Sequence, residues 1–150
     1  MTTNELIEHL EPGSQLAVQN EPFHYVGKAE VKMRGGDQVC WLYDRRKAVL
    51  SINLETDEIF IFWPVGEEAD VSEDVALYGI DQFESLSTDE GHVHTITGDV
   101  PFDEKEPVRL REYQNDEGKR LRIIQLQNTG QEHMSIGETV LEEDIFSHDE

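Results

Sequence analysis

The sequence contains only one cysteine, Cys40, which excludes an internal disulfide framework. Cys40 lies beside Trp41 within an apolar run, and this context favours a buried, unreactive thiol over a catalytic nucleophile. Residues 1–11 are polar and acidic, without the basic and apolar regions of a secretion signal. We therefore expect a cytoplasmic protein.

Long hydrophobic runs are also missing. The longest, residues 59–65, has the length of a strand, whereas a membrane-spanning helix needs about 20 apolar residues. The sequence therefore predicts no insertion into a membrane.

Positive charge is scarce: 12 Lys and Arg stand against 33 Asp and Glu, and the formal net charge is -21. Such a charge repels the phosphates of nucleic acids and anionic membranes, so we expect no nucleic-acid partner. Residues 48–104 hold fifteen acidic residues and no Lys or Arg. This segment is either a solvated surface that keeps the protein soluble or a docking face for a basic protein.

The patterns that are present are mainly those of β-structure. Thr2 and Glu5 have the spacing of a capping box, which predicts a short N-terminal helix that ends before Pro12. After residue 14, alternating and apolar runs predict strands, and residues 59–63 should be covered on both faces. The length suits a single β-rich domain, 1–150. We expect antiparallel sheets that form a barrel- or sandwich-like domain.

A weak internal repeat relates the two halves of the chain. Both contain a strand that ends in a glycine, then a loop and a hairpin, at 25–52 and at 96–123. One interpretation is a pair of pseudo-symmetric half-repeats, 14–65 and 91–146. The other is a chance likeness between β segments.

The same residues resemble a bacterial family of uncharacterised proteins, catalogued as domain of unknown function 4178. The matching positions are Leu10, Pro12, Gly13, Ser14, Tyr25, Val26, Gly27, Trp41, Leu42, Tyr43, Leu50, Ser51 and Ile52, followed by 112–115, 121–123, 135–137 and 144–145. The resemblance implies a β-rich domain and an accessory role linked to membrane-stress systems. It implies no catalytic residues.

The first candidate site is a group of arginines on a predicted hairpin, residues 108–113 and 119–126. A register that pairs Gln114 with Lys119 places Arg111 opposite Arg122 and Leu110 beside Ile123.

In this register Tyr113 lies opposite Arg120, and Arg109 shares their face. The predicted ligand-binding patch is therefore Arg109, Arg111, Tyr113, Arg120 and Arg122. Guanidinium groups suit carboxylate or phosphate ligands through bidentate hydrogen bonds. Alternatively, the acidic segment 48–104 covers the patch and neutralises it.

The second candidate site is a metal site at His92 and His94, which would share one face of a strand. A third ligand could come from Asp99, Asp103 or His133. The alternative is a pair of ordinary exposed histidines.

No serine, cysteine or glycine-rich segment has the context of a catalytic or phosphate-binding motif. We therefore expect a non-enzymatic bacterial binding or accessory module, without a cofactor, whose partner is another protein. Two alternatives stay open. One is a metal-dependent enzyme or metal-binding protein that uses His92 and His94, and the other is an acidic nucleic-acid mimic that binds a basic protein.

Overall fold

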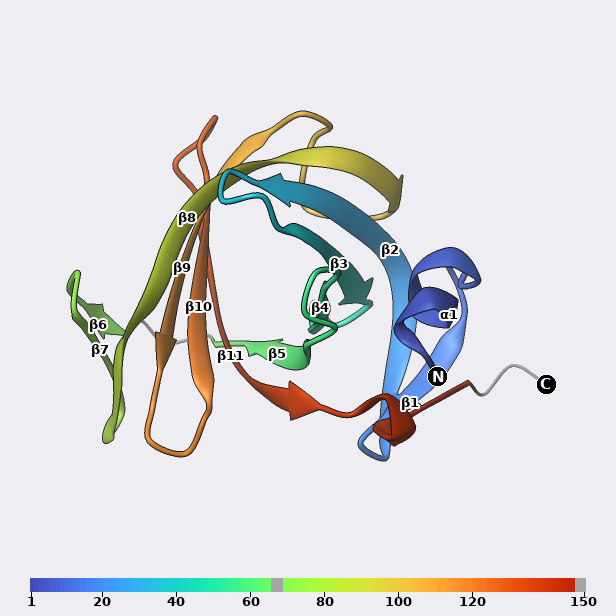
Figure 1. Cartoon of the computed structure of the whole chain (residues 1–150), viewed down its shortest axis with the longest axis horizontal. Helices are drawn as coiled ribbons and strands as arrows, with labels where there is room; N and C mark the ends of the chain where they lie inside the picture. Colours follow the sequence, from blue (N-terminus) through green and yellow to red (C-terminus); the bar gives the residue numbers. More distant parts are fainter. Residues whose placement is uncertain (66–68, 148–150) are drawn as a thin grey trace.

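The computed structural model describes residues 1–65 and 69–147, and strands dominate these ranges (Figure 1). One short helix, α1, comes first and a 3-10 turn, η1, lies near the end. The elements are α1 (Thr3–Glu8), β1 (Gln15–Val18), β2 (Glu21–Met33), β3 (Gln38–Asp44), β4 (Val49–Asn53), β5 (Ile59–Pro64), β6 (Asp70–Val71), β7 (Val75–Tyr78), β8 (Asp81–Gly98), β9 (Pro107–Gln114), β10 (Arg120–Leu126), β11 (Glu132–Val140), η1 (Glu142–Asp144) and β12 (Ile145–Ser147).

The predicted N-terminal helix and its capping box are confirmed. The Glu5 amide donates to Thr2 Oγ1 at 3.2 Å, and the Thr2 amide donates to Glu5 Oε1 at 3.1 Å. These bonds satisfy amides that have no partner within the helix. The helix lies outside β2 and buries Leu6 (Figure 1). No helix among the described residues has the length and apolar character needed to cross a membrane.

The strands form a closed antiparallel barrel, which confirms the predicted fold class. Eight strands follow one another around the ring in the order β2-β3-β4-β5-β11-β10-β9-β8, and pairing of β8 with β2 closes it. Closure removes free sheet edges from these strands. The short strands β1 and β12 continue the sheet from β2, and β7 and β6 continue it from β8.

Strands β1 to β5 each pair with the next strand in the chain, and strands β7 to β11 do the same. The two sets are joined by the antiparallel pairs β2–β8 and β5–β11. The second set begins at Val75, earlier than residue 91 of the predicted half-repeat. A repeat in the sequence itself stays a prediction.

Both long strands change the face that they bury. A bulge at Val26 in β2 separates Tyr25, which packs outside the barrel, from Ala29, which packs inside. A bulge at Leu86 in β8 follows Phe83, which also packs outside, and Val93 further along points inside. An extra residue in one strand shifts the alternation of its side chains. Each long strand can therefore belong to the barrel and to a flap on its outer surface.

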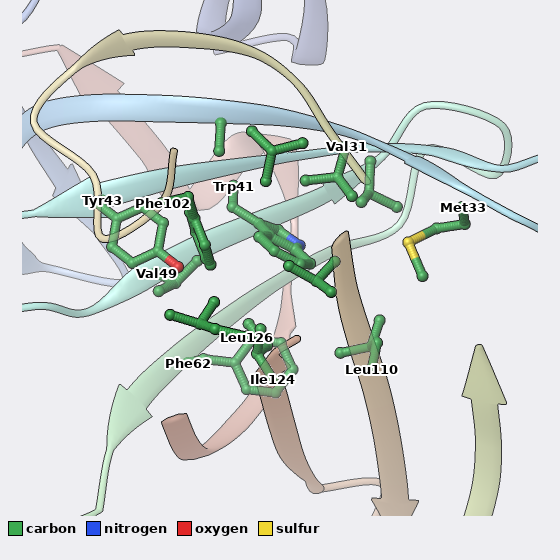
Figure 2. Packing of buried hydrophobic residues seen from close by; sticks show 14 of the residues in the cluster. Val31, Met33, Trp41, Tyr43, Val49, Phe62, Phe102, Leu110, Ile124 and Leu126 are labelled. Carbon is green, nitrogen blue, oxygen red and sulfur yellow. The ribbon is translucent and has the colours of Figure 1, made fainter. Parts of the chain in front are cut away.

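These flaps give the protein three hydrophobic cores. One fills part of the barrel interior (Figure 2). The second lies between the outer face of β3, β4 and β5 and the elements α1, β1 and β12. The third lies between β7 and the outer face of β9, β10 and β11. Consequently Ile59 to Phe62 of β5 are buried on both faces, as predicted, while Trp63 is 37% exposed.

Cys40 is fully buried in the second core, in agreement with the expected inert thiol. Burial raises the pKa of its thiol to about 12, so the reactive thiolate is disfavoured at neutral pH.

One end of the barrel is closed by the loop between β8 and β9. Phe102 of this loop points into the barrel, where its ring centroid lies 5.6 Å from that of Trp41 and 5.9 Å from that of Tyr43 (Figure 2). The buried Glu106 side chain accepts a hydrogen bond from the Asp103 amide at 3.0 Å and fixes the loop. The interior at this end is therefore filled by aromatic side chains.

Replacing Phe102 with Ala should lower the free energy of unfolding by about 3 kcal/mol, because it removes a buried ring and leaves a cavity among aromatic partners. Phe146→Ala is the matched control: Phe146 is 57% exposed, so its loss should cost less than about 1 kcal/mol. Urea unfolding measures both. Equal costs would show that Phe102 does not close the barrel.

Candidate functional site at the open end of the barrel

The opposite end of the barrel contains a cavity of about 430 Å³. It lies between the turn after β2, the turn after β4, the middle of β8 and the ends of β9 and β10. Its lining is Met33, Gly35, Asp37, Val39, Ser51, Asn53, Glu58, Phe60, Ser87, Thr88, Asp89, Leu110, Glu112, Arg120 and Arg122. Barrels of eight strands are wide enough to hold one small ligand, and this volume is usual for ligand pockets.

The predicted hairpin of β9 and β10 exists, but its predicted register is wrong by one residue. Gln114 pairs with Arg120, whereas we expected Lys119. Lys119 belongs to the turn: its amide donates to Asn115 Oδ1 at 2.9 Å, and its carbonyl accepts from the Asn115 amide at 3.0 Å. The asparagine side chain thus organises a turn that is one residue longer than we assumed, because it includes Lys119.

A shift of one residue exchanges the faces of a strand, so the predicted arginine patch is divided. Arg122 lies opposite Glu112 and shares the barrel interior with Arg120. Arg111 lies opposite Ile123 on the outer face. Arg109 is also outside and exposed.

The three predicted residues on the outer face do not line the cavity. Arg111 forms an ion pair with Glu132 at 3.3 Å. Tyr113 is buried beneath β7, and its hydroxyl donates to the Ser72 carbonyl at 2.7 Å. Tyr113 therefore contributes to packing, and two of the five predicted site residues, Arg120 and Arg122, belong to the cavity.

Arg122 is held in the barrel by a network of buried polar groups. Its Nε and Nη2 donate to one oxygen of Glu112 at 3.3 and 3.1 Å, and its Nη1 donates to Ser51 Oγ at 2.9 Å. Its guanidinium lies over the ring of Phe62, 4.0 Å from the centroid. The side chain is only 7% exposed, so its charge depends on Glu112 for compensation.

Arg120 lies nearer the opening and is bound less completely. Its Nε donates to Gln114 Oε1 at 3.2 Å, and its guanidinium lies 4.2 Å from the centroid of the Phe60 ring. Its Nη1 is 3.9 Å from Glu112, and its Nη2 is 3.8 Å from Glu58. Both separations exceed the length of a hydrogen bond. Within the described residues, the two Nη groups of Arg120 therefore have hydrogen bonds left to give.

Carboxylates surround the opening of the cavity. Asp37 accepts from Asn53 Nδ2 at 3.2 Å, and Asp89 accepts from the Gly35 amide at 3.3 Å. Glu58 is about half exposed and, among the residues described, is the only carboxylate of the acidic segment 48–104 that forms an ion pair with a predicted site arginine. Neutralisation of the arginines by that segment is thus limited to Arg120, because Arg122 is paired by Glu112 of its own hairpin.

His92 and His94 are both exposed on β8, on either side of the buried Val93. In the part of the chain that the structure describes, no three His, Cys, Asp or Glu residues form a group that could hold a metal ion. His133 packs instead against Phe102 near the closed end, where burial lowers the pKa of its imidazole. Neither Asp99, Asp103 nor His133 therefore joins the predicted pair.

Sequence reasoning missed the acidic half of this site. Glu112 lies on the same strand face as Leu110 and Val108. A lone glutamate at the end of an apolar face is a signal of a buried ion pair. Ser51 carried a similar signal between Leu50 and Ile52. Asp37 and Asp89 come from turns and strands far apart in the sequence, and only the closed barrel brings them together.

Replacing Glu112 with Gln should lower the free energy of unfolding by about 3 kcal/mol, because Arg122 would keep its charge in the barrel without a counter-charge. Glu132→Gln is the control. It removes a carboxylate from the more exposed pair with Arg111 and should cost less than about 1 kcal/mol. Thermal or urea unfolding gives both values. A smaller loss for Glu112→Gln than for Glu132→Gln would contradict the buried network.

Comparison of the chain with models of protein families, with curated proteins and with solved structures finds no match. The resemblance to domain of unknown function 4178 is neither supported nor contradicted by this result and stays a prediction.

Proposed function

We propose that the protein is a non-enzymatic binding module that takes one small polar ligand into the open end of its barrel. The observation that carries this proposal is the pair of guanidinium groups inside the barrel, at the wall of a cavity of about 430 Å³. Arg122 is fixed by Glu112 and Ser51, while Arg120 still has donors to offer.

The contrast between the two ends of the barrel supports a binding role. Around Phe102 the interior is filled by apolar and aromatic side chains, which is the arrangement that stability alone favours. At the other end, buried ionic groups replace such packing although their desolvation is costly. Polar groups placed in a mostly formed pocket are typical of ligand sites, where they fix the orientation of the ligand.

The cavity wall is also held in place before any ligand arrives. Arg120 is fixed between the ring of Phe60 and the amide of Gln114, and Arg122 by the ring of Phe62. Side chains that are ordered in advance lose little entropy on binding. This rigidity favours recognition over adaptable protein docking.

Binding of a protein partner is a second candidate function. The net charge of -21 and the absence of Lys and Arg from segment 48–104 favour it. A basic protein would be attracted to this surface, as the nucleic-acid mimic hypothesis also requires. The predicted arginine patch does not support a protein partner as a single face, because Arg109 and Arg111 lie outside the barrel while Arg120 and Arg122 lie inside. A bacterial accessory role in membrane stress rests on the family resemblance alone.

Amide resonances in ¹⁵N spectra should report the proposed ligand site directly. Titration with a library of small polar compounds should shift the resonances of Ser51, Asp89 and Arg120. Ser87→Trp should abolish these shifts, because an indole at this exposed lining position obstructs the opening. Ser85→Trp, two residues away and outside the lining, should leave them unchanged. Compounds that shift no cavity resonance, or that bind the Ser87→Trp protein equally well, would contradict the proposal.

A further inference from the structure

The charged side chains that line the cavity fall into an inner and an outer layer, which differ in burial. The deeper layer holds Arg122, Glu112 and Arg120, whose side chains are 7, 11 and 19% exposed. In this layer two guanidinium groups stand against the single carboxylate of Glu112, and Glu58 of the outer layer lies 3.8 Å from Arg120 Nη2. The outer layer holds the carboxylates Asp37, Glu58 and Asp89 and no Lys or Arg.

This layering points to a ligand that carries both charges. We infer that the site binds a small zwitterion, with a carboxylate directed inward to Arg120 and an ammonium group held at the opening. The inference rests on the proposed function and adds the chemical class of the ligand.

The carboxylate of the ligand would bind Arg120. Its Nη1 and Nη2 lie 3.9 and 3.8 Å from the nearest carboxylates, too far for hydrogen bonds. The two groups form a fork that matches the two oxygens of a carboxylate, and the ring of Phe60 fixes the plane of that fork. A carboxylate would therefore gain two charge-assisted hydrogen bonds without first breaking any that Arg120 makes through these atoms.

The ammonium group of the ligand would bind the carboxylates at the opening. Asp37 and Asp89 each accept hydrogen bonds from neighbouring residues and keep further lone pairs for a ligand. They do not gather into a group that could hold a metal ion within the described chain. Spread around an opening, they suit an ammonium group, which donates in three directions.

Ligands with charge of one sign fit poorly to a cavity with guanidinium groups inside and carboxylates at the opening. A dianion would bring a second negative charge to the three carboxylates at the opening, and a dication would bring a positive charge to Arg120. A neutral diol would satisfy hydrogen bonds but would gain nothing from either charged layer. Only a zwitterion matches both layers at once.

A set of four-carbon probes of equal length tests the inference in solution. The probes are 4-aminobutyrate, succinate, 1,4-diaminobutane and 1,4-butanediol, each titrated into the full chain at low salt and followed by ¹⁵N spectra. The affinity for 4-aminobutyrate should exceed that for each other probe by about tenfold or more, since succinate and 1,4-diaminobutane each lack one of the two charged contacts and 1,4-butanediol lacks both.

Two pairs of variants test which residues bind the two charged groups of the ligand. Arg120→Gln should weaken 4-aminobutyrate by about 10- to 100-fold through loss of the charged donors, while Arg109→Gln, on the outer face, should have no effect. Asp89→Asn should weaken it by about threefold or more, while Asp81→Asn, on the same strand but outside the cavity, should not. Unchanged spectra elsewhere in each variant show that the fold is kept.

The outcomes separate this inference from the proposed function. Preference for another of the four probes, with shifts confined to the cavity, would overturn the zwitterion and leave the binding function standing. Binding of polar library compounds in the cavity without binding of 4-aminobutyrate would do the same. Absence of any cavity shift, with these probes and with the library, would overturn both.

Discussion

The ion pair between Arg122 and Glu112 inside the barrel is the interaction on which the open end depends. A guanidinium that is 7% exposed is tolerated because Glu112 supplies the opposite charge and Ser51 accepts a hydrogen bond from Nη1. The pair occupies interior positions on β9 and β10. The space that remains is the cavity, and Arg120 stands at its wall beside the same carboxylate.

The closed end of the barrel therefore contributes to stability, and the open end provides the cavity for recognition. The closed end is filled by Phe102, Trp41 and Tyr43, so it contributes packing. The flaps on the outer surface add two further cores, which lets the interior at the open end remain partly polar without loss of the fold. Bulges in β2 and β8 make this division possible, because they let one strand serve both the barrel and a flap.

Much of the fold could be predicted from local patterns, whereas the site could not. The capping box at Thr2, the apolar strand β5 and the hairpin of β9 and β10 were visible because each depends on neighbouring residues. The register of that hairpin was missed because both faces of β10 are buried: Ile123 packs outside and Ile124 inside. A pattern that is apolar on both faces does not fix which face is the interior. Contacts that depend on closure of the barrel lie beyond any local pattern.

The most direct test of this account is the exchange of guanidinium protons with solvent in the free protein, measured by NMR. The Nε proton of Arg122 should exchange slowly, because it is buried and donates to Glu112, whereas that of the exposed Arg109 should exchange fast. Arg120 should lie between them. Equal exchange at Arg122 and Arg109 would show that Arg122 is outside the barrel and would contradict the account.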